Sequence, residues 1–329
     1  MRAFLVTSTA DGITASIEDV DPGILEGEIL IQVDVAGVNF KDSMVRVPGN
    51  KVARRSPLIP GVDLAGTVLE TVEGGPPIGT AVIAHCHGVG VTSHGGFAPL
   101  ARVPLEWIQP MPPGLDSRSA MILGTAGFTA MASLVALERH GLTPSSGPLV
   151  VTGAAGGVGS TSVAIASAAG YEVVASTGRA HEAPFLEGLG ASQVIGRDEI
   201  DDRPDRTLGT ERWAGAIDCV GGTTLSAILR SLRYGGAVAA SGLTGGAELT
   251  TTVFPFIVRS VALLGIDAVE MGAAERDALW RRLGSDVPHA VIEKLLERTV
   301  TLDGVPDALD AIARGGVRGR IIVDLAGED

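Results

Sequence analysis

The chain contains 329 residues, of which 45% are hydrophobic and 19% are charged, and its formal net charge at pH 7 is −13. This length is sufficient for two domains of ordinary size, and the apolar fraction is typical of a globular protein rather than a disordered one. The negative charge argues against nonspecific binding to nucleic acid or to an anionic membrane surface.

The N-terminal third is predicted to be rich in β-structure. Segments such as "EILIQVDVAGV" and "GTAVIAHCHGVG" mix alternating and continuous apolar residues, and Gly and Pro separate them. The opening "MRAFLVTSTADG" has no basic region followed by an apolar core, and no apolar stretch is long enough to span a bilayer. Two cysteines, Cys86 and Cys219, are too few for a disulfide framework. We therefore expect a soluble cytoplasmic protein with no nucleic-acid or membrane partner.

A helical pattern rich in Ala, Met and Leu begins near residue 116, and from residue 149 onward short strands alternate with helices. The predicted strands are "PLVVTG", "YEVVAST", "ASQVIG", "GAIDCVG", "GAVAASGL" and "VALLGID". The predicted helices between them are "GSTSVAIASAAG", "APFLEGLG", "TTLSAILRSLRYG" and "TVFPFIVRS". This alternation is typical of an α/β domain with a doubly wound parallel sheet and helices on both faces.

The C-terminal region returns to β-structure, because an amphipathic "ALWRRLGS" helix is followed by the apolar strand "RGRIIVDL". This strand can complete the β-rich domain, which would then be discontinuous. We predict a β-rich domain over 1–118, a parallel-sheet domain over 119–285, and a return segment over 286–329.

Four glycines lie within "LVVTGAAGGVGST" (149–161), where a predicted strand passes through a turn into a helix. Gly153 ends the strand, Gly156 and Gly157 let the backbone approach a ligand, and Gly159 permits close packing of helix on sheet. The free N–H groups that open the helix favour a pyrophosphate. The spacing differs from the usual G-x-G-x-x-G and by itself also fits a simple tight turn. The strand before it, the helix after it and the further strand–helix units indicate a dinucleotide site.

The end of the second predicted strand indicates which dinucleotide binds. An NAD site would place Asp or Glu there to accept from the ribose 2′-hydroxyl, but this chain has Ser176, Thr177, Gly178 and Arg179. Glu172 falls at the start of the strand instead. Hydroxyls and a guanidinium suit a 2′-phosphate, so NADPH is predicted. The alternative is that Arg179 is a solvated surface residue.

Seven segments occur in an order that resembles a known family across nearly the whole chain. They are "GVNFKD", "IPGVDLAGTV", "GTAGFTAM", "VTGAAGGVGST", "WAGAIDCVGG", "PFIVRSVALLGID" and "GRIIV". Together they resemble the zinc-free, quinone-oxidoreductase-like branch of the medium-chain dehydrogenase/reductases, and within it the acrylyl-CoA reductase (NADPH) subgroup. The resemblance implies a GroES-like catalytic domain beside a Rossmann NADPH-binding domain, an active site in the cleft between them, and a homodimer.

The predicted cofactor-binding residues combine the glycine-rich turn, the end of the second strand and positions implied by the resemblance. They are Thr125, Gly153, Gly156, Gly157, Val158, Gly159, Ser160, Thr161, Thr177, Gly178, Arg179, Arg197, Leu243 and Ile257.

No metal is predicted. Zinc-dependent relatives place a His-Glu pair after "PG" and a cysteine as the first catalytic ligand, whereas this chain has Val62-Asp63 and Asn39 there. The cluster "HCH" at 85–87 invites a metal, but alternate residues of a strand share one face, which leaves at most two ligands on that face. His94 is expected to order a loop, although a place lining the cleft stays open.

The resemblance places catalysis around Asn39 and Phe40, with Arg320 as a further catalytic candidate. Close relatives carry tyrosine where this chain has Phe40, so any proton donated by that hydroxyl must come here from water or another group. The reaction we expect is conjugate reduction: a hydride passes from NADPH to the β-carbon of an enoyl thioester, and N–H donors or a guanidinium stabilise the enolate. Such a reaction depends on orientation more than on acid–base groups.

A basic segment, "KDSMVRVPGNKVARR" (41–55), stands out in this acidic chain because it holds five basic residues against one acidic. Its residues Arg46, Lys51, Arg54 and Arg55 are predicted to bind the phosphates of a CoA substrate. The alternative is a solvated charged loop.

Three functions remain open at this level: an NADPH-dependent reductase of a short enoyl-CoA such as acrylyl-CoA, a reductase of quinones or other activated alkenes, and a non-catalytic NADPH-binding protein. The basic segment favours the first, since a quinone would not need it.

Overall fold

The computed structural model describes residues 1–10, 12–200 and 205–327. The chain forms two compact units. The first comprises Met1–Thr125, Val269–Gly284 and Leu296–Asp329, and the second comprises Ala126–Ala268 and Ser285–Leu295. Each unit is described by itself below.

The first unit is built on a seven-stranded sheet and a separate two-stranded one. Strands β1 (Arg2–Thr9) and β2 (Gly12–Asp19) pair antiparallel. The larger sheet has the order β14-β15-β3-β4-β5-β7, with β6 also paired to β3. Its strands are β3 (Ile29–Val38), β4 (Asp63–Glu70), β5 (Ala81–His85), β6 (Leu100–Val103), β7 (Ile108–Pro110), β14 (Leu296–Val300) and β15 (Arg320–Asp324). The apolar residues of these strands form one buried core.

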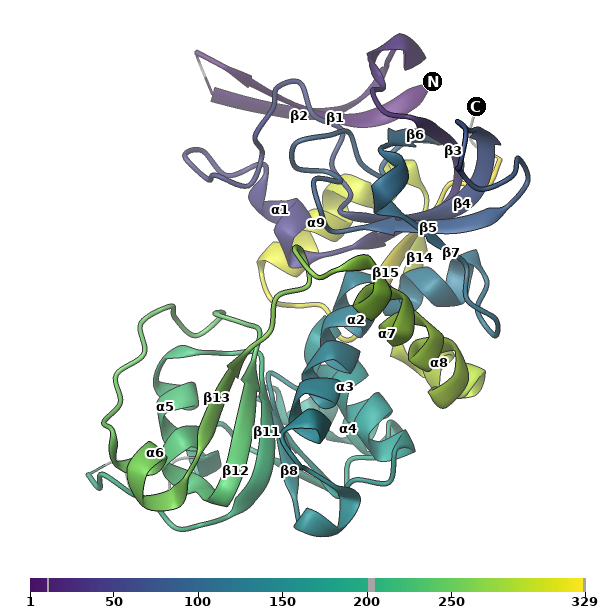
Figure 1. The fold of residues 1–329 in the computed structure, drawn as a ribbon. Coiled ribbons are helices and arrows are strands. Elements are labelled where there is room, and N and C mark those ends of the chain that lie inside the picture. The colour runs from purple at the N-terminus through teal and green to yellow at the C-terminus, as the bar shows by residue number, and fades with distance from the viewer. Residues whose placement is uncertain (11, 201–204, 328–329) are drawn as a thin grey trace. The chain divides into compact units, whose positions relative to one another are not determined.

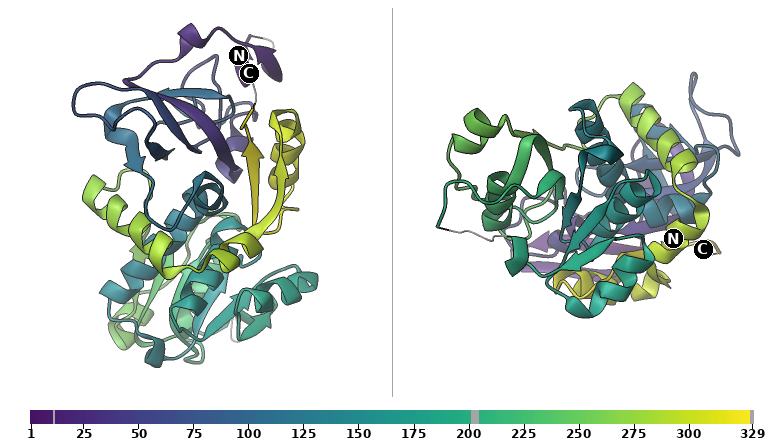
Figure 2. Two further views of the ribbon diagram at one scale, coloured as in Figure 1. Left: turned by 90° about the vertical axis from the view of Figure 1, so that its right-hand side faces the viewer. Right: turned by 90° about the horizontal axis from the view of Figure 1, so that it is seen from below.

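The C-terminal segment is part of this first unit. Strand β15 pairs antiparallel with β3, with Ile321 opposite Val38, and helix α9 (Val305–Ala313) packs on α1 (Phe40–Met44). In Figures 1 and 2 the yellow C-terminal segment accordingly lies beside strands from the start of the chain.

The second unit holds a six-stranded parallel sheet of order β10-β9-β8-β11-β12-β13, which confirms the predicted doubly wound Rossmann fold. The strands are β8 (Leu149–Thr152), β9 (Val173–Ser176), β10 (Gln193–Ile195), β11 (Trp213–Asp218), β12 (Leu232–Ala240) and β13 (Ala262–Gly265). Its crossover helices are α3 (Gly157–Ala168), α4 (Ala183–Gly188), α5 (Gly222–Ser231) and α6 (Phe254–Arg259). Figure 1 shows α5 and α6 on one side of the sheet and α3 and α4 on the other.

The two compact units differ from the ranges predicted from sequence because of two helices near the C-terminal end. Helix α7 (Ala273–Asp286) belongs largely to the first unit because Trp280 packs on His85 at the end of β5. Helix α8 (His289–Leu295) belongs to the second unit because it packs on α3. The predicted ranges instead place nearly all of α7 in the parallel-sheet domain over 119–285 and α8 in the return segment over 286–329.

The long helix α2 (Ser117–Arg139) is broken at Gly124, where φ is 52° and ψ is −156°. Its 18-residue apolar window has the length and hydropathy of a membrane span, but 83% of that window is buried inside the protein, as in a core helix. The two units divide directly after Thr125, one residue beyond this break. The first N–H groups of the helical segment after the break therefore have no carbonyl acceptor within the helix.

Candidate cofactor and substrate sites

The glycine-rich turn between β8 and α3 has the geometry of an anion-binding loop. Gly153 has a φ of 60°, which favours glycine, and Gly156 forms the N-cap of α3. A Cβ at Gly159 would lie 2.3 Å from the carbonyl oxygen of Gly153, so this position must stay bare for the helix to pack. A Cβ at Gly156 would meet nothing closer than 3.4 Å. The backbone at Gly156 is therefore not crowded by other atoms of the protein, in contrast to that at Gly159.

Three further predicted residues lie in the first turns of α3. Val158 is half-buried there, while Ser160 and Thr161 are buried. The hydroxyl of Thr161 donates to the carbonyl oxygen of Gly157 at 2.7 Å, and that of Ser160 donates to the same oxygen at 3.4 Å. Both hydroxyls are thus bound to their own helix, and the main-chain N–H groups are what the turn offers a ligand.

Two arginines lie near the end of β9: Arg179 follows this strand directly, and Arg197, which follows β10, lies over Gly178. The Nη2 of Arg179 donates to the carbonyl oxygen of Ala155 at 2.9 Å, and its Nη1 lies 4.0 Å from Glu182. The guanidinium of Arg197 covers Gly178 so closely that a Cβ there would lie 2.6 Å from its Nε. The hydroxyl of Thr177 accepts from the main-chain N–H of Arg179 at 3.1 Å. This arrangement concentrates positive charge where a dinucleotide carries its 2′-substituent.

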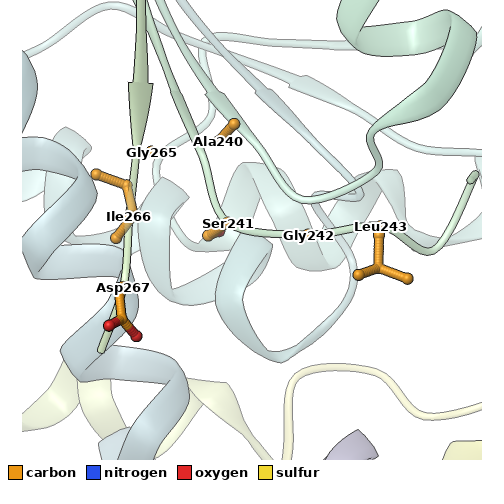
Figure 3. Close-up of a pocket in the computed structure, with 7 residues that line it drawn as sticks. All are labelled: Ala240, Ser241, Gly242, Leu243, Gly265, Ile266 and Asp267. Atoms are coloured by element: carbon orange, nitrogen blue, oxygen red, sulfur yellow. The ribbon is translucent and has the colours of Figure 1, made fainter. Parts of the chain in front are cut away.

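A pocket lies where β12 and β13 end, and Figure 3 shows its lining residues at the ends of these strands and on the segments that follow them. Leu243, a predicted cofactor residue, is among them and its side chain is 65% exposed. Carboxyl ends of parallel strands are where ligands bind in such sheets. Ile257 lies in α6, which leads into the opposite end of β13, so the structure does not bring it to this pocket.

In the first unit, Asn39 and Phe40 sit where β3 ends and α1 begins. The main-chain N–H of Asn39 donates to Asp42 Oδ2 at 2.8 Å, and Asp42 Oδ1 accepts from the N–H groups of Gly61 and Val62 at 3.2 and 3.0 Å. Burial, together with repulsion from a neighbouring carboxylate, raises the pKa of Asp42 to about 7. The side chain of Phe40 is 49% exposed. Asp42 thus anchors the turn that presents an aromatic ring at the surface of this unit.

Arg320, the third catalytic candidate, is 2% exposed and lies among main-chain acceptors. Its Nε donates to the carbonyl oxygen of Ile122 at 3.0 Å, and its Nη1 donates to the carbonyl oxygen of Val38 at 3.2 Å and to Asn39 Oδ1 at 3.1 Å. Its Nη2 lies 3.8 Å from Asp63 Oδ2, which places a buried ion pair beneath the Asn39 turn. Burial lowers the pKa of Arg320, while Asp63 and Asp42 oppose that shift.

Thr125, predicted to bind cofactor, is tied to the same ion pair. Its N–H, the one exposed by the break in α2, donates to Asp63 Oδ2 at 2.7 Å. Its hydroxyl lies 3.8 Å from the Sγ of Cys86. Thr125 therefore belongs to the network around Arg320, although its sequence position gave no sign of that contact.

The histidine and cysteine cluster at 85–87 does not lie on one strand, so the expected alternation of faces does not apply to these three residues. Strand β5 ends at His85, and Cys86 and His87 have positive φ values of 58° and 44°. The Nε2 of His85 accepts from Trp280 Nε1 at 2.9 Å and lies 2.8 Å from Arg276 Nη1. Burial and the charge of Arg276 hold the pKa of His85 well below its usual range.

Metal-ligand chemistry gains no support elsewhere in the described part of the chain, where no group of three or more His, Cys, Asp or Glu side chains is arranged to hold an ion. His94 orders a loop, as expected, because its Nδ1 accepts from the main-chain N–H of Ile59 at 3.1 Å. Burial and Arg55 lower the pKa of His94 to about 4, so this acceptor stays unprotonated.

The basic segment divides into paired and unpaired residues. Arg46 lies 2.7 Å from Asp310, and Arg55 lies 3.4 Å from Glu26. Lys51 and Arg54 are exposed and make no ion pair with any residue that the structure describes. The segment therefore offers fewer free cations than its composition predicts.

Sequence reasoning missed Asp42 and Asp63 as members of the site. Both are fully buried, and Asp63 Oδ1 has no hydrogen-bond partner within the described residues. A Cβ at Gly37 or at Gly124 would approach the carboxylate of Asp63 to 2.3 or 2.6 Å. A carboxylate directly after the apolar "IPGV" run was the available signal, since acidic residues are rarely buried without a partner.

Comparison with known proteins gives two family matches. Residues 157–283 match the zinc-binding dehydrogenase family, and residues 25–113 match the alcohol dehydrogenase GroES-like domain. The chain is 46% identical to the acrylyl-CoA reductase AcuI of Ruegeria pomeroyi, over 91% of this chain and 90% of that protein. It is 41% identical to the putative quinone oxidoreductase YhfP of Bacillus subtilis, over 98% of both.

Two solved structures share the fold. Escherichia coli K-12 YhdH with bound NADPH is 42% identical, with a TM-score of 0.94 over 98% of this chain and 99% of that one. Bacillus subtilis YhfP with NAD bound is 41% identical, with a TM-score of 0.95 over 98% of both chains. The relatives thus include proteins with either nicotinamide cofactor, and two different activities appear in their names.

Proposed function

The chain belongs to the medium-chain dehydrogenase/reductase family, and from that premise we propose that it reduces a short enoyl-CoA, acrylyl-CoA to propionyl-CoA, at the expense of NADPH. The observation that carries the proposal is the 46% identity to an acrylyl-CoA reductase over 91% of the chain. The same relative supports a CoA thioester as the small-molecule partner.

NADPH as the cofactor is supported by the charge at the end of β9. Arg179 and Arg197 flank Gly178, and the uncrowded backbone at Gly156 forms the N-cap of α3. These residues would hold a 2′-phosphate and a pyrophosphate respectively. The related YhdH structure holds NADPH, which agrees with this assignment. When bound, NADPH supplies the hydride.

For the reduction, the chain must stabilise negative charge on the thioester carbonyl oxygen and allow a proton to reach the α-carbon. Asn39 offers an amide Nδ2 that is buried and has no partner among the residues described. A donor fixed in place before the reaction stabilises such an oxyanion more than mobile water does. Phe40 has no ionisable group, so it can wall the site or stack on a ring but cannot donate the proton.

The phosphates of CoA are assigned to the basic segment, in particular to Lys51 and Arg54, whose charges are exposed and unpaired in the described structure. Arg46 and Arg55 share their charge with carboxylates and contribute less. Remote contacts of this kind hold the acyl group in the orientation that the reaction needs.

A quinone or activated-alkene reductase is the second candidate, because the 41% identity to a putative quinone oxidoreductase covers 98% of the chain. NADPH oxidation by chelator-dialysed protein with acrylyl-CoA, crotonyl-CoA and a quinone separates the candidates. We expect the CoA esters to be reduced, with full activity after removal of metal. Turnover of the quinone alone would favour the second candidate, and no turnover with any acceptor would leave a non-catalytic NADPH-binding protein.

We further propose a homodimer formed along β13, the strand at the edge of the parallel sheet. Leu263 on this strand is 37% exposed, and Val258 and Ile257 on the preceding helix are 51% and 71% exposed. An apolar edge of this kind is available for pairing with another strand. Sedimentation equilibrium is expected to give twice the 33.5 kDa mass of the chain.

A further inference from the structure

We infer that Arg320 is a positioning residue: with Asp63 as its counter-ion, it orients the carboxamide of Asn39 so that the Nδ2 amide donates to the thioester carbonyl oxygen of the substrate. This inference rests on the proposed function, and it assigns to Arg320 a role that acts through Asn39 and not by contact with substrate.

The orientation of the Asn39 amide follows from the chemistry of its partner. Arg320 Nη1 lies 3.1 Å from Asn39 Oδ1, and a guanidinium donates hydrogen bonds but does not accept them. The oxygen of the carboxamide must therefore face Arg320, and the NH₂ group must face away from it.

Arg320 is itself held in place from several sides. Its Nε and Nη1 donate to the carbonyl oxygens of Ile122 and Val38, and its Nη2 faces Asp63 at 3.8 Å. Asp63 is fixed in turn by the N–H of Thr125. The guanidinium is 2% exposed, so neither it nor its counter-ion has freedom to rearrange in solvent.

Two glycines leave the space that the Arg320–Asp63 ion pair occupies. A Cβ at Gly37 would lie 2.3 Å from Asp63 Oδ1 and 2.9 Å from Arg320 Nη2. A Cβ at Gly124 would lie 2.6 Å from Asp63 Oδ2 and 2.7 Å from Arg320 Nη2. Side chains at either position would force the pair apart, so the chain is shaped around it on both sides.

The Nδ2 of Asn39, a donor without a partner, indicates the function of the hydrogen bonds around Arg320. Asn39 is 8% exposed, its main-chain N–H is bound to Asp42, and its Oδ1 is bound to Arg320. Its Nδ2 has no hydrogen-bond partner in the described structure, and the other such donor beside it, Arg320 Nη2, faces the carboxylate of Asp63 at 3.8 Å. A buried donor without an acceptor is unfavourable, so a ligand oxygen is its natural partner. The carbonyl of the thioester, which gains negative charge during conjugate reduction, is the acceptor we assign.

A double-mutant cycle tests the positioning role. Asn39→Ala should lower kcat for acrylyl-CoA about 100-fold, the usual loss for an oxyanion donor, with the KM for NADPH unchanged. Arg320→Lys keeps the charge but cannot reach all of the acceptors, and it should lower kcat at least tenfold. In the Asn39→Ala background Arg320→Lys should cause no further loss of kcat. Arg102→Lys, at a surface pair with Glu70 in the same unit, is the matched control and should leave kcat unchanged.

Independent, multiplying losses from the two substitutions, or a raised KM for NADPH in Arg320→Lys, would overturn the inference, because Arg320 would then act on ligand directly or on the fold. If wild type does not reduce acrylyl-CoA, the proposed function fails. If wild type does so and Asn39→Ala retains that rate, only the present inference fails.

A measurement on the unaltered protein covers the case in which Arg320→Lys does not fold. The chain contains two asparagines, Asn39 and Asn50, so selective ¹⁵N-asparagine labelling gives two side-chain NH₂ pairs. Because the Asn50→Ser variant lacks one of the two NH₂ pairs, its spectrum shows which pair belongs to Asn39. Addition of NADP⁺ and propionyl-pantetheine, which lacks the nucleotide phosphates, should shift the Asn39 pair and slow its exchange with water. The Asn50 pair, whose Oδ1 accepts from the N–H of Val52, should not move. An unmoved Asn39 pair at saturating ligand would overturn the inference.

Discussion

The proposed preference for NADPH over NADH depends most directly on Arg179, which donates to the carbonyl oxygen of Ala155 in the glycine-rich turn. Arg179→Ala should weaken NADPH binding by about 1.5–3 kcal/mol, the range for a hydrogen bond to a charged group, and leave NADH binding nearly unchanged. Fluorescence titration with both cofactors measures the difference. Arg233→Ala, at a half-buried arginine that donates to the carbonyl oxygen of Ser146 in the same unit, serves as the control. Equal losses for both cofactors would place Arg179 away from the 2′-phosphate.

Asp42 gives a second prediction at the scale of a residue, because its pKa of about 7 lies above the ordinary value of 3.8. Between these values the native protein keeps a proton that the unfolded chain has lost. The contribution of Asp42 to stability is therefore complete below about pH 4 and is lost as the pH rises through 7. The slope is at most about 1.4 kcal/mol per pH unit for one proton.

His85 and His94 act in the opposite direction, since their pKa values are lowered in the native state. The test therefore compares the wild type with Asp42→Asn by urea unfolding at several pH values. The stability of the wild type relative to the variant should fall as the pH rises from about 4 to 7. A difference that stays constant with pH would show that Asp42 is ionised throughout.

The sequence singled out Arg179 but not Asp42 or Asp63, and the reason is physical. The end of the second strand is a position where a local pattern, hydroxyls and a guanidinium in place of an acid, bears directly on the ligand. Asp63 instead gains its role from Arg320, which is far away in the sequence and adjacent only because β15 pairs with β3.

At the scale of elements, two glycines of the β8–α3 turn should respond differently to the same change. A Cβ at Gly159 would collide with the carbonyl oxygen of Gly153 at 2.3 Å, so Gly159→Ala should lower the melting temperature and cofactor binding together. A Cβ at Gly156 would meet its nearest atom at 3.4 Å, an ordinary contact, so Gly156→Ala should keep the melting temperature of the cofactor-free protein yet weaken NADPH binding. Undiminished NADPH binding by Gly156→Ala would move the pyrophosphate away from this turn.

The basic segment tests the CoA assignment. Lys51→Ala with Arg54→Ala removes the two exposed, unpaired charges, and the KM for acrylyl-CoA should rise several-fold, at about 0.5–1 kcal/mol per contact. The sensitivity of this KM to salt should diminish as well, because exposed contacts are screened over about 8–10 Å. The KM for NADPH and for acrylyl-pantetheine should not change.

Arg55→Ala, which removes an arginine already paired with Glu26, is the matched control and should have a smaller effect. An unchanged KM for the CoA ester in the double variant would leave the segment as a solvated loop. The composition was enough to identify this segment as basic. The pairing of Arg46 and Arg55 with carboxylates distant in the sequence could not be predicted, because it depends on the fold.

At the scale of the whole molecule, the alternation of strands and helices from residue 149 predicted the parallel sheet, and the structure confirms it. The predicted helix "TTLSAILRSLRYG" ends earlier, at Ser231, because its last residues begin strand β12. The division of residues 269–295 between two units could not be predicted, because it depends on which surface each of α7 and α8 packs against. Periodicity identifies the elements but not their long-range partners.

Conjugate reduction of an enoyl-CoA by NADPH is the central claim, and the fate of the hydride tests it most directly. NADPH deuterated at C4 of the nicotinamide is incubated with acrylyl-CoA and the protein, and the product is analysed by mass spectrometry and NMR. The account predicts propionyl-CoA carrying one deuterium from the cofactor at its β-carbon. Deuterium at the α-carbon, or oxidation of the cofactor by a quinone while acrylyl-CoA is left unreduced, would contradict it.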